Sequence, residues 1–574
     1  MIIAAALVLI PGISVYFLYL NYNNVYKKYQ AIFQSYQLTD TPETEEPIIL
    51  QLTNGEVPSW LNGIMYRIGP GKFNIKQNDG STFSIKHAFD GLPFMHRFQI
   101  DGSAQTLKYN SRCLSKSIEK KIEQKSYKGI IFFGHVPVVS FLQWIYHFLN
   151  RLDSFILRPR PDESPDAHSV GVTATPNFPL PSHWKSAGRQ QPVLVSKTDA
   201  NILQKINAET LVPEKVFNYT TFDKRLKGEF SAAHHQYDSE TKEAFNFTLS
   251  FAPRPRMIVF STSDSGNVTI LADITHRMDK SRIGAPYIHS FWLTKNYIII
   301  PESPLTYHDK CLNMLLNGSV LSSMAWQDDT PTYFHIVSRK GGLVASIPVP
   351  PFYTFHVANS FDSIDPVTGD TILTLDSASF SDGDILNQLH TFGTGHPKSI
   401  ALKPEPFTRF HGMAYPPARQ AKFGDLQRYK LNLTKSEHIS TNLLCKNVEF
   451  PRFNQKFALQ SNSQFIFGCE LFAYTEKTDE SSGLIKVDML TGDRLRYGQE
   501  GYSCSEPIFV PNPQSSSEDD GVLLTLANNV DCCYLIIVNS VTMKELSRFK
   551  IGQFTAVTFH GSFVDHEFES ININ

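Results

Sequence analysis

The stretch Ala556-Val557-Thr558-Phe559-His560-Gly561-Ser562-Phe563 places a histidine inside a run of β-branched and aromatic residues. This composition predicts a strand, and the glycine after His560 is typical of a point where a strand ends or bends. Three other stretches share this character, and they present His234 (SAAHHQYD, 231–238), His289 (APYIHSFWL, 285–293) and His356 (PFYTFHVANSF, 351–361). Four strands that brought these imidazoles to one point would form an all-nitrogen metal site. The alternative for each histidine is a hydrogen-bonded residue of the core.

Length and composition limit the class of protein. A chain of 574 residues far exceeds one hydrophobic core, so it forms several domains or a repeat architecture. The formal charge of −2 argues against a nucleic-acid-binding protein with a broad basic face. The seven cysteines contain no CxxC pair and are odd in number, which disfavours a zinc–thiolate site or a disulfide framework.

The N-terminus differs from the rest of the chain. Ile2–Leu20 is almost wholly apolar and uncharged, and it is just long enough to span a bilayer. It lacks the basic N-terminal region and the small-residue cleavage site of a secretory signal. Lys27 and Lys28 follow it, which favours a cytoplasmic location for the rest of the chain. We therefore expect a membrane segment over 1–22, a linker over 23–50 and one domain over 51–574. A cleaved or interfacial segment is the alternative.

From residue 51 the chain consists of short extended runs separated by turn residues. Strands are predicted, for example, over 64–68, 94–100, 242–251, 257–261, 296–301, 371–375 and 522–526. Hairpin-like patterns recur, as in 205–211 and 486–493, and the second half shows no sustained helical periodicity. An all-β fold with radial repetition suits so many short strands, because it leaves few exposed sheet edges.

One stretch departs from this pattern. Residues 130–149 read IIFFGHVPVVSFLQWIYHFL, with six aromatic Phe, Trp or Tyr side chains and no charge apart from neutral histidines. Four lysines precede it (Lys120, Lys121, Lys125 and Lys128), Arg151 follows it and Pro137 interrupts it. The stretch is either a buried helix or helix pair, or a patch that docks onto a membrane surface.

A four-histidine metal site would need carboxylates behind it. Four neutral imidazoles leave a 2+ charge uncompensated, and carboxylates that accept the second ring N–H both balance the charge and fix the tautomer. Candidates in strand-like contexts are Asp199, Glu449 and Glu506. The alternative for each of these three acids, considered alone, is a residue on the surface or in a loop.

The motifs together resemble the carotenoid cleavage oxygenase family, which includes the retinal-forming oxygenases and the retinal-pigment-epithelium isomerase. The resemblance runs in order from Glu56 to Phe563. It is carried by Trp60-Leu61-Asn62-Gly63, Arg67 to Gly71, His87 to Gly91 with His96, Ala233-His234, Tyr287 to His289, Phe355-His356, Val448-Glu449, Ser505-Glu506, Glu518 to Val522 and Phe559-His560-Gly561.

This resemblance implies a seven-bladed β-propeller with Fe(II) on its axis under a cap of helices and loops. The metal ligands would be His234, His289, His356 and His560, backed by Asp199, Glu449 and Glu506. The activity implied is O2-dependent cleavage of a carotenoid or apocarotenoid double bond, with no catalytic side chain beyond the ligands. Residues 130–149 fall where relatives carry an apolar membrane-docking patch.

Two positions depart from the family pattern. Asp199 stands where relatives usually have glutamate, and because its side chain is one methylene shorter we expect a longer or water-bridged approach to His289. His235 stands where relatives commonly have proline, and Ala-His matches the family, so His234 is the predicted ligand.

Two other hypotheses remain open. One is a non-oxidative retinoid isomerase or isomerohydrolase that uses the same iron. The other is a propeller that serves as an interaction scaffold.

Overall fold

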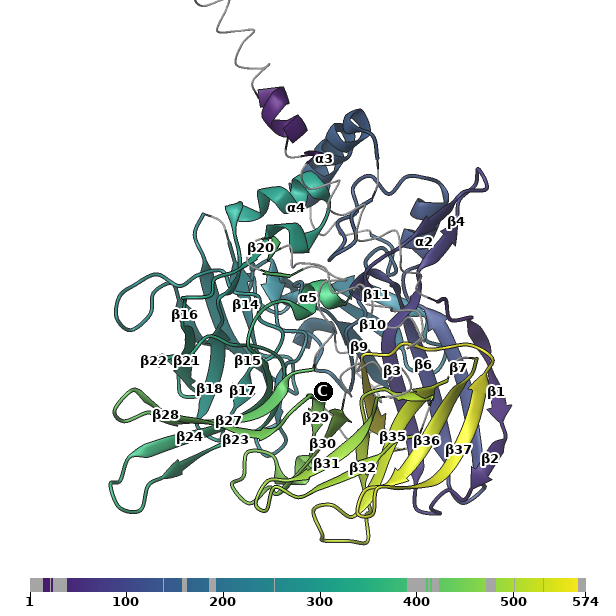
Figure 1. Cartoon of the computed structure of the whole chain (residues 1–574), viewed down its shortest axis with the longest axis vertical. Helices are drawn as coiled ribbons and strands as arrows, with labels where there is room; N and C mark the ends of the chain where they lie inside the picture. The colour runs from purple at the N-terminus through teal and green to yellow at the C-terminus, as the bar shows by residue number, and fades with distance from the viewer. Residues whose placement is uncertain are drawn as a thin grey trace, which may run out of the picture.

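Strands form nearly all of the regular structure, as the alternation of short apolar runs and turn residues predicts. In the computed structural model the described residues are 14–20, 22–23, 39–137, 139–156, 163–184, 192–251, 253–389, 409–410, 413–414, 423–470, 482–499, 501–529 and 531–565. The strands form seven antiparallel blades of a β-propeller (Figure 1). The predicted fold class is therefore confirmed.

The blades follow one another along the chain, apart from the first and last. The first has the order β1 Thr44–Leu50, β7 Thr106–Cys113, β6 Leu92–Asp101, β3 Asn62–Lys72 and β38 His560–Val564. The second has the order β11 Pro213–Phe217, β10 Leu203–Asn207, β9 Val193–Lys197 and β8 Thr173–Pro176. The third contains β12 Phe230–Ser231, β13 Gln236–Asp238, β14 Glu243–Ser250, β15 Arg256–Ser263 and β16 Val268–Ile274.

Three further blades have four strands each. The fourth blade contains β17 Trp292–Leu293, β18 Tyr297–Glu302, β21 Thr332–Ser338 and β22 Leu343–Val349. The fifth contains β23 Tyr353–Ile364, β24 Thr371–Phe380, β27 Asp425–Asn432 and β28 Glu437–Cys445. The sixth contains β29 Val448–Arg452, β30 Phe465–Glu470, β31 Gly483–Asp488 and β32 Arg494–Tyr497.

Strands from both ends of the chain close the ring. The seventh blade contains β2 Leu52–Gly55, β37 Lys544–Gly552, β36 Cys533–Asn539, β35 Gly521–Asn528, β34 Ile508–Pro511 and β33 Ser503–Cys504. β2 pairs with β37, and β3 pairs with β38, so each of two neighbouring blades combines N-terminal and C-terminal strands. Such closure leaves few unpaired sheet edges.

One edge strand of each blade faces the axis. The edge strands contact one another around the ring: β38 with β8, β13 with β17, β17 with β23, β23 with β29, and β34 with β38. Side chains on these strands from distant parts of the sequence therefore meet at the centre.

Helices and short hairpins cover one end of the propeller (Figure 1). The helices are α2 Lys116–Glu123, α3 Phe141–Ile156, α4 Leu312–Asn317 and α5 Ile385–Gln388. The 3-10 turns are η1 Ala88–Asp90, η2 Ser182–Trp184, η3 Tyr219–Thr221, η4 Asp309–Cys311, η5 Val320–Ser323 and η7 Gln455–Phe457. The hairpins are β4 Asn74–Lys76 with β5 Thr82–Ser84, β19 Leu305–Tyr307 with β20 Met324–Trp326, and β25 Arg409–Phe410 with β26 Met413–Ala414.

The apolar stretch 130–149 forms part of this cap. Its second half begins α3, which buries Trp144 and His147 but leaves Leu142 77% and Leu149 57% exposed. The helix is therefore amphipathic and extends seven residues past the predicted stretch. Residues 14–20 form a helix beside it, with Tyr19 stacked edge-on against Phe141.

Most of the predicted N-terminal membrane segment, including residues 1–13, lies outside the described residues. Among the helices that the structure describes, none has the length and apolar character needed to cross a membrane. All seven cysteines are buried and free.

Candidate metal centre

The four predicted histidines converge on the propeller axis from four different blades. His356 lies on β23 and His560 begins β38. His234 lies in the connection between β12 and β13, and His289 lies just before β17, so the prediction that all four lie on strands is wrong for these two. Both are nonetheless next to axial edge strands, His234 between β12 and β13 and His289 before β17.

The imidazoles are close enough to share one ion. One ring nitrogen from each histidine lies within 4.8 Å of the corresponding atom of every other. Nε2 of His560 lies 3.1 Å from Nε2 of His234 and 3.2 Å from Nε2 of His356. Two nitrogens bound at about 2.1 Å to one metal ion, at right angles, lie about 3 Å apart. The spacing therefore fits a shared metal ion.

The environment also keeps three of these rings, those of His234, His356 and His560, neutral. All four side chains are buried, with at most 9% of any residue exposed. Burial, together with the neighbouring imidazoles, lowers the pKa of His234, His356 and His560 well below the usual histidine value. A neutral imidazole has the free nitrogen lone pair that metal binding requires.

Asp199 follows β9 and contacts His289 directly. Its Oδ2 and Oδ1 lie 2.9 Å and 3.0 Å from Nδ1 of His289. The expectation of a longer or water-bridged approach is therefore wrong. The Tyr287 hydroxyl donates to Oδ2 at 2.7 Å and fixes the carboxylate in this position.

The two predicted glutamates each hold one of the remaining rings. Oε2 of Glu449, on β29, lies 2.5 Å from Nδ1 of His356, and Oε1 of Glu506 lies 2.9 Å from Nδ1 of His560. The carboxylates thus occupy the outer ring nitrogens, which leaves the inner nitrogens directed at one another and at the shared position.

Two arginines near Glu506 were not predicted as site residues. Buried Arg67, on β3, donates at 2.8 Å to the Glu506 backbone oxygen, and its Nη1 lies 3.5 Å from Oε2. Arg452, on β29, donates from Nε to Oε1 at 3.0 Å. Both positions lie in or next to motifs that the sequence showed, Arg67 to Gly71 and Val448-Glu449-Phe-Pro, but sequence reasoning gave neither arginine a role.

Gly561 explains the close packing behind His560. A Cβ atom at this position would lie 2.5 Å from Cδ of Arg67 and 2.7 Å from the Tyr66 carbonyl oxygen. The Gly561 N–H donates to Glu506 Oε2 at 2.9 Å. The close approach of Arg67 and of the Tyr66 carbonyl therefore requires a glycine here, whereas the N–H that Glu506 accepts is present in every residue except proline.

Other histidines of the recognised motifs lie outside the cluster. His235 is buried and its Nδ1 faces the Lys197 ammonium, so its ring is directed away from the centre. His87 contacts the Leu386 carbonyl at 2.9 Å through Nε2, and His96 contacts the Tyr109 hydroxyl at 3.0 Å. His234 rather than His235 joins the cluster, as predicted.

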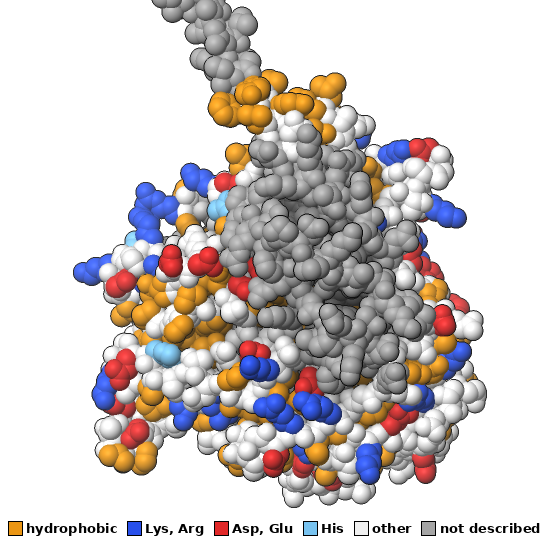
Figure 2. Space-filling model, in the orientation of Figure 1, with side chains coloured by type: hydrophobic (Ala, Val, Ile, Leu, Met, Phe, Trp, Pro, Cys, Tyr) orange, Lys and Arg blue, Asp and Glu red, His pale blue; other side chains and the backbone are white. Residues whose placement is uncertain are grey.

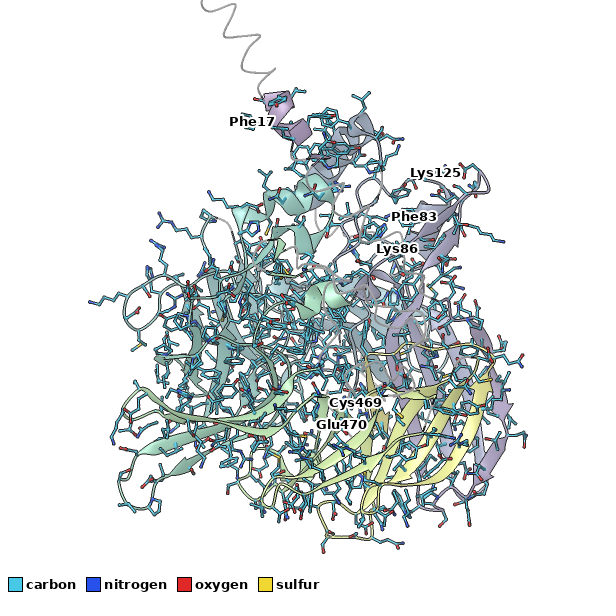
Figure 3. The ribbon with its side chains drawn as sticks, in the orientation of Figure 1. Phe17, Phe83, Lys86, Lys125, Cys469 and Glu470 are labelled. Carbon is cyan, nitrogen blue, oxygen red and sulfur yellow. The ribbon has the colours of Figure 1, made fainter. Side chains whose placement is uncertain are left out.

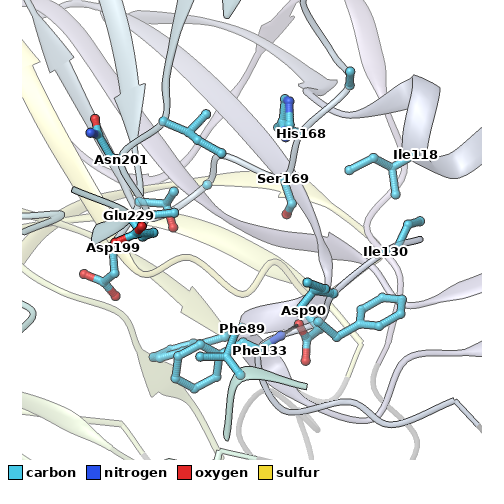
Figure 4. Close-up of a pocket in the computed structure, with 18 of the residues that line it drawn as sticks. Phe89, Asp90, Ile118, Ile130, Phe133, His168, Ser169, Asp199, Asn201 and Glu229 are labelled. Atoms are coloured by element: carbon cyan, nitrogen blue, oxygen red, sulfur yellow. Dashed lines mark hydrogen bonds between the residues drawn. The ribbon is translucent and has the colours of Figure 1, made fainter. Parts of the chain in front are cut away.

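A large cavity lies under the cap, next to residues that surround the cluster, and a smaller pocket of about 60 Å³ is lined by His234 and His356 themselves. The volume of the large cavity is about 1260 Å³, and Phe559 is part of its wall. Phe89 and Phe133 lie on one side of it and Asp199 and Glu229 on another (Figure 4). Tyr287 also lines it, so the bonded pair Tyr287–Asp199 connects the cavity wall with His289. The volume of this cavity exceeds that of an ordinary small-molecule pocket.

Asp90 holds one wall of this cavity. Its carboxylate accepts backbone N–H groups of Phe133, of Gly134 at 2.8 Å and of His135 at 2.6 Å. The aspartate of the motif His87 to Gly91 therefore fixes the segment that brings Phe133 into the cavity.

Comparisons with known proteins agree with this arrangement. The model of the retinal pigment epithelial membrane protein family matches residues 39–565. A carotenoid dioxygenase of Neurospora crassa is 26% identical over 91% of this chain and 89% of its own length. The mitochondrial carotenoid-cleaving dioxygenase of Homo sapiens is 25% identical over 89% of this chain and 87% of its own length.

Solved structures show the same fold. A mutant of the Synechocystis apocarotenoid oxygenase superposes with a TM-score of 0.68 at 18% identity, over 93% of this chain and 98% of the other. Its cobalt-substituted form gives the same TM-score and coverage. The chain belongs to the retinal pigment epithelial membrane protein family, the carotenoid cleavage oxygenases, and is an oxygenase enzyme.

Proposed function

We propose that this protein is an Fe(II)-dependent dioxygenase that cleaves a conjugated C=C bond of a carotenoid or apocarotenoid with O2 and releases two carbonyl products. The observation that carries the proposal is the set of four buried imidazoles directed at one position beside a cavity of about 1260 Å³. The curated relatives described above are carotenoid dioxygenases by name, which supports the same substrate class.

The residues present fit the metal. His234, His289, His356 and His560 would hold it through the nitrogens that face one another. Ferrous iron bound there supplies the O2-dependent redox chemistry that no side chain of the protein has. Asp199, Glu449 and Glu506 accept the outer ring N–H groups, hold each tautomer and supply the negative charge that a divalent ion requires.

Aromatic residues on and near the cavity wall would orient the substrate and exclude water. The ring of Phe89 lies 5.2 Å from that of Phe559 and 5.9 Å from that of Phe355, and Phe355 in turn lies 5.2 Å from the ring of His289. These aromatic rings would pack against the faces of a polyene and exclude water from the reacting bond. The position at which the cavity ends would then determine which double bond lies beside the metal.

The test measures metal, oxygen and products together. Purified protein is analysed for bound iron and then incubated with β-carotene and with 8′-apo-β-carotenal under air and without O2. We expect about one iron per chain and two carbonyl fragments by mass spectrometry, only in the presence of O2. Isomerised or hydrolysed products that form without O2 would contradict the dioxygenase proposal and support the isomerase hypothesis.

We also propose that the cap docks onto a membrane from which the substrate enters. Leu142 and Leu149 on α3 are exposed, as is Phe17 (64%) on the adjacent helical residues 14–20. Figure 2 shows hydrophobic side chains gathered at this end, and Figure 3 places Phe17 there, far from Cys469 and Glu470 in the propeller.

The two apolar segments form one surface. The Tyr22 hydroxyl donates to the Val139 carbonyl at 2.9 Å, and the Tyr22 ring lies 5.9 Å from that of Trp144. Lysine side chains border it, and Lys128 lies over the ring of Tyr146. Apolar side chains bordered by lysines are suited to a bilayer interface that contains anionic lipids.

A further inference from the structure

The smaller pocket of about 60 Å³ reaches the four-histidine cluster directly. His234 and His356 line it, together with Glu506. The large cavity under the cap is lined by none of the four histidines, although all four are among the described residues. No residue that the structure describes lines both spaces. Of these two spaces, the smaller one therefore leads to the side chains that would bind a metal ion.

The histidines lie between the two spaces. Tyr287 lines the large cavity, whereas Ser290, directly after His289, lines the small pocket. Phe230 likewise lines the large cavity, and His234, further along the same connection, lines the small pocket. Each of these two segments thus passes from the large cavity to the small pocket at its histidine.

The exposure of the four side chains agrees with this arrangement. His356 and His234, which line the small pocket, are 9% and 5% exposed, whereas His289 and His560 are each 2% exposed. Gln455 lines the same pocket and is an exposed residue, so the pocket extends to the protein surface. An ion in solution can therefore approach two of the four ligands from this side.

The wall of the small pocket carries groups that suit a hydrated cation. Its polar members, apart from the two histidines, are Gln236, Tyr237, Ser290, Asn359, Ser360, Arg452, Gln455 and Glu506. Oxygen atoms of amide, hydroxyl and carboxylate groups can take the place of water around a divalent ion. Such a wall lowers the cost of removing part of the hydration shell before the ion reaches the imidazoles.

The other side of the cluster is screened by aromatic rings. The ring of Phe355 lies 5.2 Å from that of His289, and Phe559 directly precedes His560. The ring of Phe89 lies 5.9 Å from Phe355 and 5.2 Å from Phe559. A cation that entered through the large cavity would lose water among these apolar rings, which is unfavourable.

The positive charge at the small pocket is paired. Arg452 is the only lysine or arginine among the described residues that line it. Its Nε donates to Oε1 of Glu506 at 3.0 Å, and its Nη2 donates to the Gly561 carbonyl at 3.2 Å. Because the adjacent carboxylate balances the guanidinium, the pair presents little net repulsion to an approaching cation.

We propose that the small pocket is the route by which the metal ion enters and leaves the centre. A divalent cation from solution passes Gln455, binds first to His234 and His356, and is then enclosed by His289 and His560. This inference rests on the metal site of the function proposed above, but it depends on neither the substrate nor the reaction. A route determines the height of a barrier, so its obstruction should slow loading and release by the same factor and leave the affinity unchanged.

The test follows iron without turnover. Apo-protein is mixed with Fe(II) in the absence of O2, iron-loaded protein is mixed with excess isotopically labelled Fe(II), and bound iron is measured by mass spectrometry after desalting. Ala458→Trp fills the small pocket, which half-buried Ala458 lines. We expect loading and exchange to slow at least about tenfold, which corresponds to a barrier higher by about 1.4 kcal/mol. The Kd for Fe(II), measured by competition with a chelator, should stay the same.

The matched control places the same side chain in the other space. Val320 is also half-buried but lines the large cavity, and Val320→Trp should leave both rates unchanged.

A second set of variants acts through charge at an exposed position and requires no repacking. At low ionic strength Gln455→Glu should accelerate loading about threefold and Gln455→Lys should slow it about threefold, and both differences should disappear at high salt. Gln124→Lys, at the exposed end of α2 in the cap, should have no effect.

The outcomes separate the route from the site. Slower loading in Val320→Trp, with unchanged rates in Ala458→Trp and in the Gln455 variants, would overturn the proposal and assign the route to the large cavity. Unchanged rates in every variant would overturn it as well. A different Kd in Ala458→Trp would indicate a distorted site, and the Gln455 variants would then decide. Wild-type protein that binds no Fe(II) would contradict the proposed function and the route together, whereas binding with unaltered rates rejects the route alone.

Discussion

The carboxylate of Asp199 lies within hydrogen-bonding distance of Nδ1 of His289 through both of its oxygens, at 2.9 Å and 3.0 Å. A shorter side chain achieves this contact because backbone bonds join the segments: the Asp199 carbonyl accepts the Ser231 N–H at 2.9 Å, and the His289 carbonyl accepts the His234 N–H at 3.3 Å. The Ala233 N–H also approaches Oδ1, at 3.3 Å, so Asp199 links the segment that carries His234 with the ring of His289.

Replacement of this carboxylate should weaken the metal site. Asp199→Asn removes the negative charge that orients His289 while it preserves the shape of the side chain. We expect metal affinity to fall by about 10- to 100-fold, the usual effect of losing such a partner. Competition with a coloured chelator measures the affinity directly, and Asp531→Asn, an exposed turn aspartate, is the control. Unchanged affinity would show that His289 is held by packing alone.

Glu506 should matter more for stability than Glu449. Buried Arg67 lies 3.5 Å from the Glu506 carboxylate, so Glu506→Gln leaves an uncompensated guanidinium. Breaking a buried ion pair in this way costs about 3–5 kcal/mol. Glu449 has no arginine in contact among the described residues, and Glu449→Gln should cost less. Urea unfolding of both variants tests the order, and equal losses would contradict it.

Gly561→Ala should disrupt the centre through sterics alone. The new methyl group would lie 2.5 Å from Arg67 and 2.6 Å from Ile508, inside a buried region that cannot expand. We expect a loss of stability of about 1–3 kcal/mol and a lower iron content. Gly498→Ala is the matched control, because its nearest neighbour would lie 3.9 Å away. Iron analysis and thermal unfolding distinguish the two variants.

Asp90→Ala should loosen residues 133–135, which form part of the cavity wall. Three backbone N–H groups at 133–135 would lose their shared acceptor, and the expected cost is about 2–4 kcal/mol. Phe133 would then be free to move, so KM should rise more than kcat falls. The control is Asp79→Ala, an exposed partner of Lys125, which should change stability little. Steady-state kinetics that showed only a lower kcat would contradict this role.

Membrane docking can be tested on α3. Leu142→Asp together with Leu149→Asp places two charges on the exposed apolar face, and we expect co-sedimentation with phosphatidylserine-containing vesicles to fall at least fivefold. Leu490→Asp, which is 76% exposed at a propeller turn, should leave binding unchanged. Binding that persists in the double variant would place the membrane contact elsewhere.

Much of the fold could be predicted because each strand is specified locally. The runs at 64–68, 94–100 and 522–526 lie within β3, β6 and β35, and all four histidines were identified from their apolar surroundings. Strand and turn preferences depend on a few neighbouring residues, so both can be predicted from the sequence alone. Glu449 and Glu506 were predicted to lie behind the metal ligands, but the pairing of Glu449 with His356 was not predicted, since nothing local in the sequence connects the two.

The remaining features depend on contacts between distant segments. His234 and His289 reach the axis from connections rather than strands. The direct Asp199–His289 contact depends on two backbone bonds between distant segments, from the Ser231 N–H to the Asp199 carbonyl and from the His234 N–H to the His289 carbonyl. Local propensities carry no information about such distances. They are fixed only when the blades pack around one axis and their side chains share the space there.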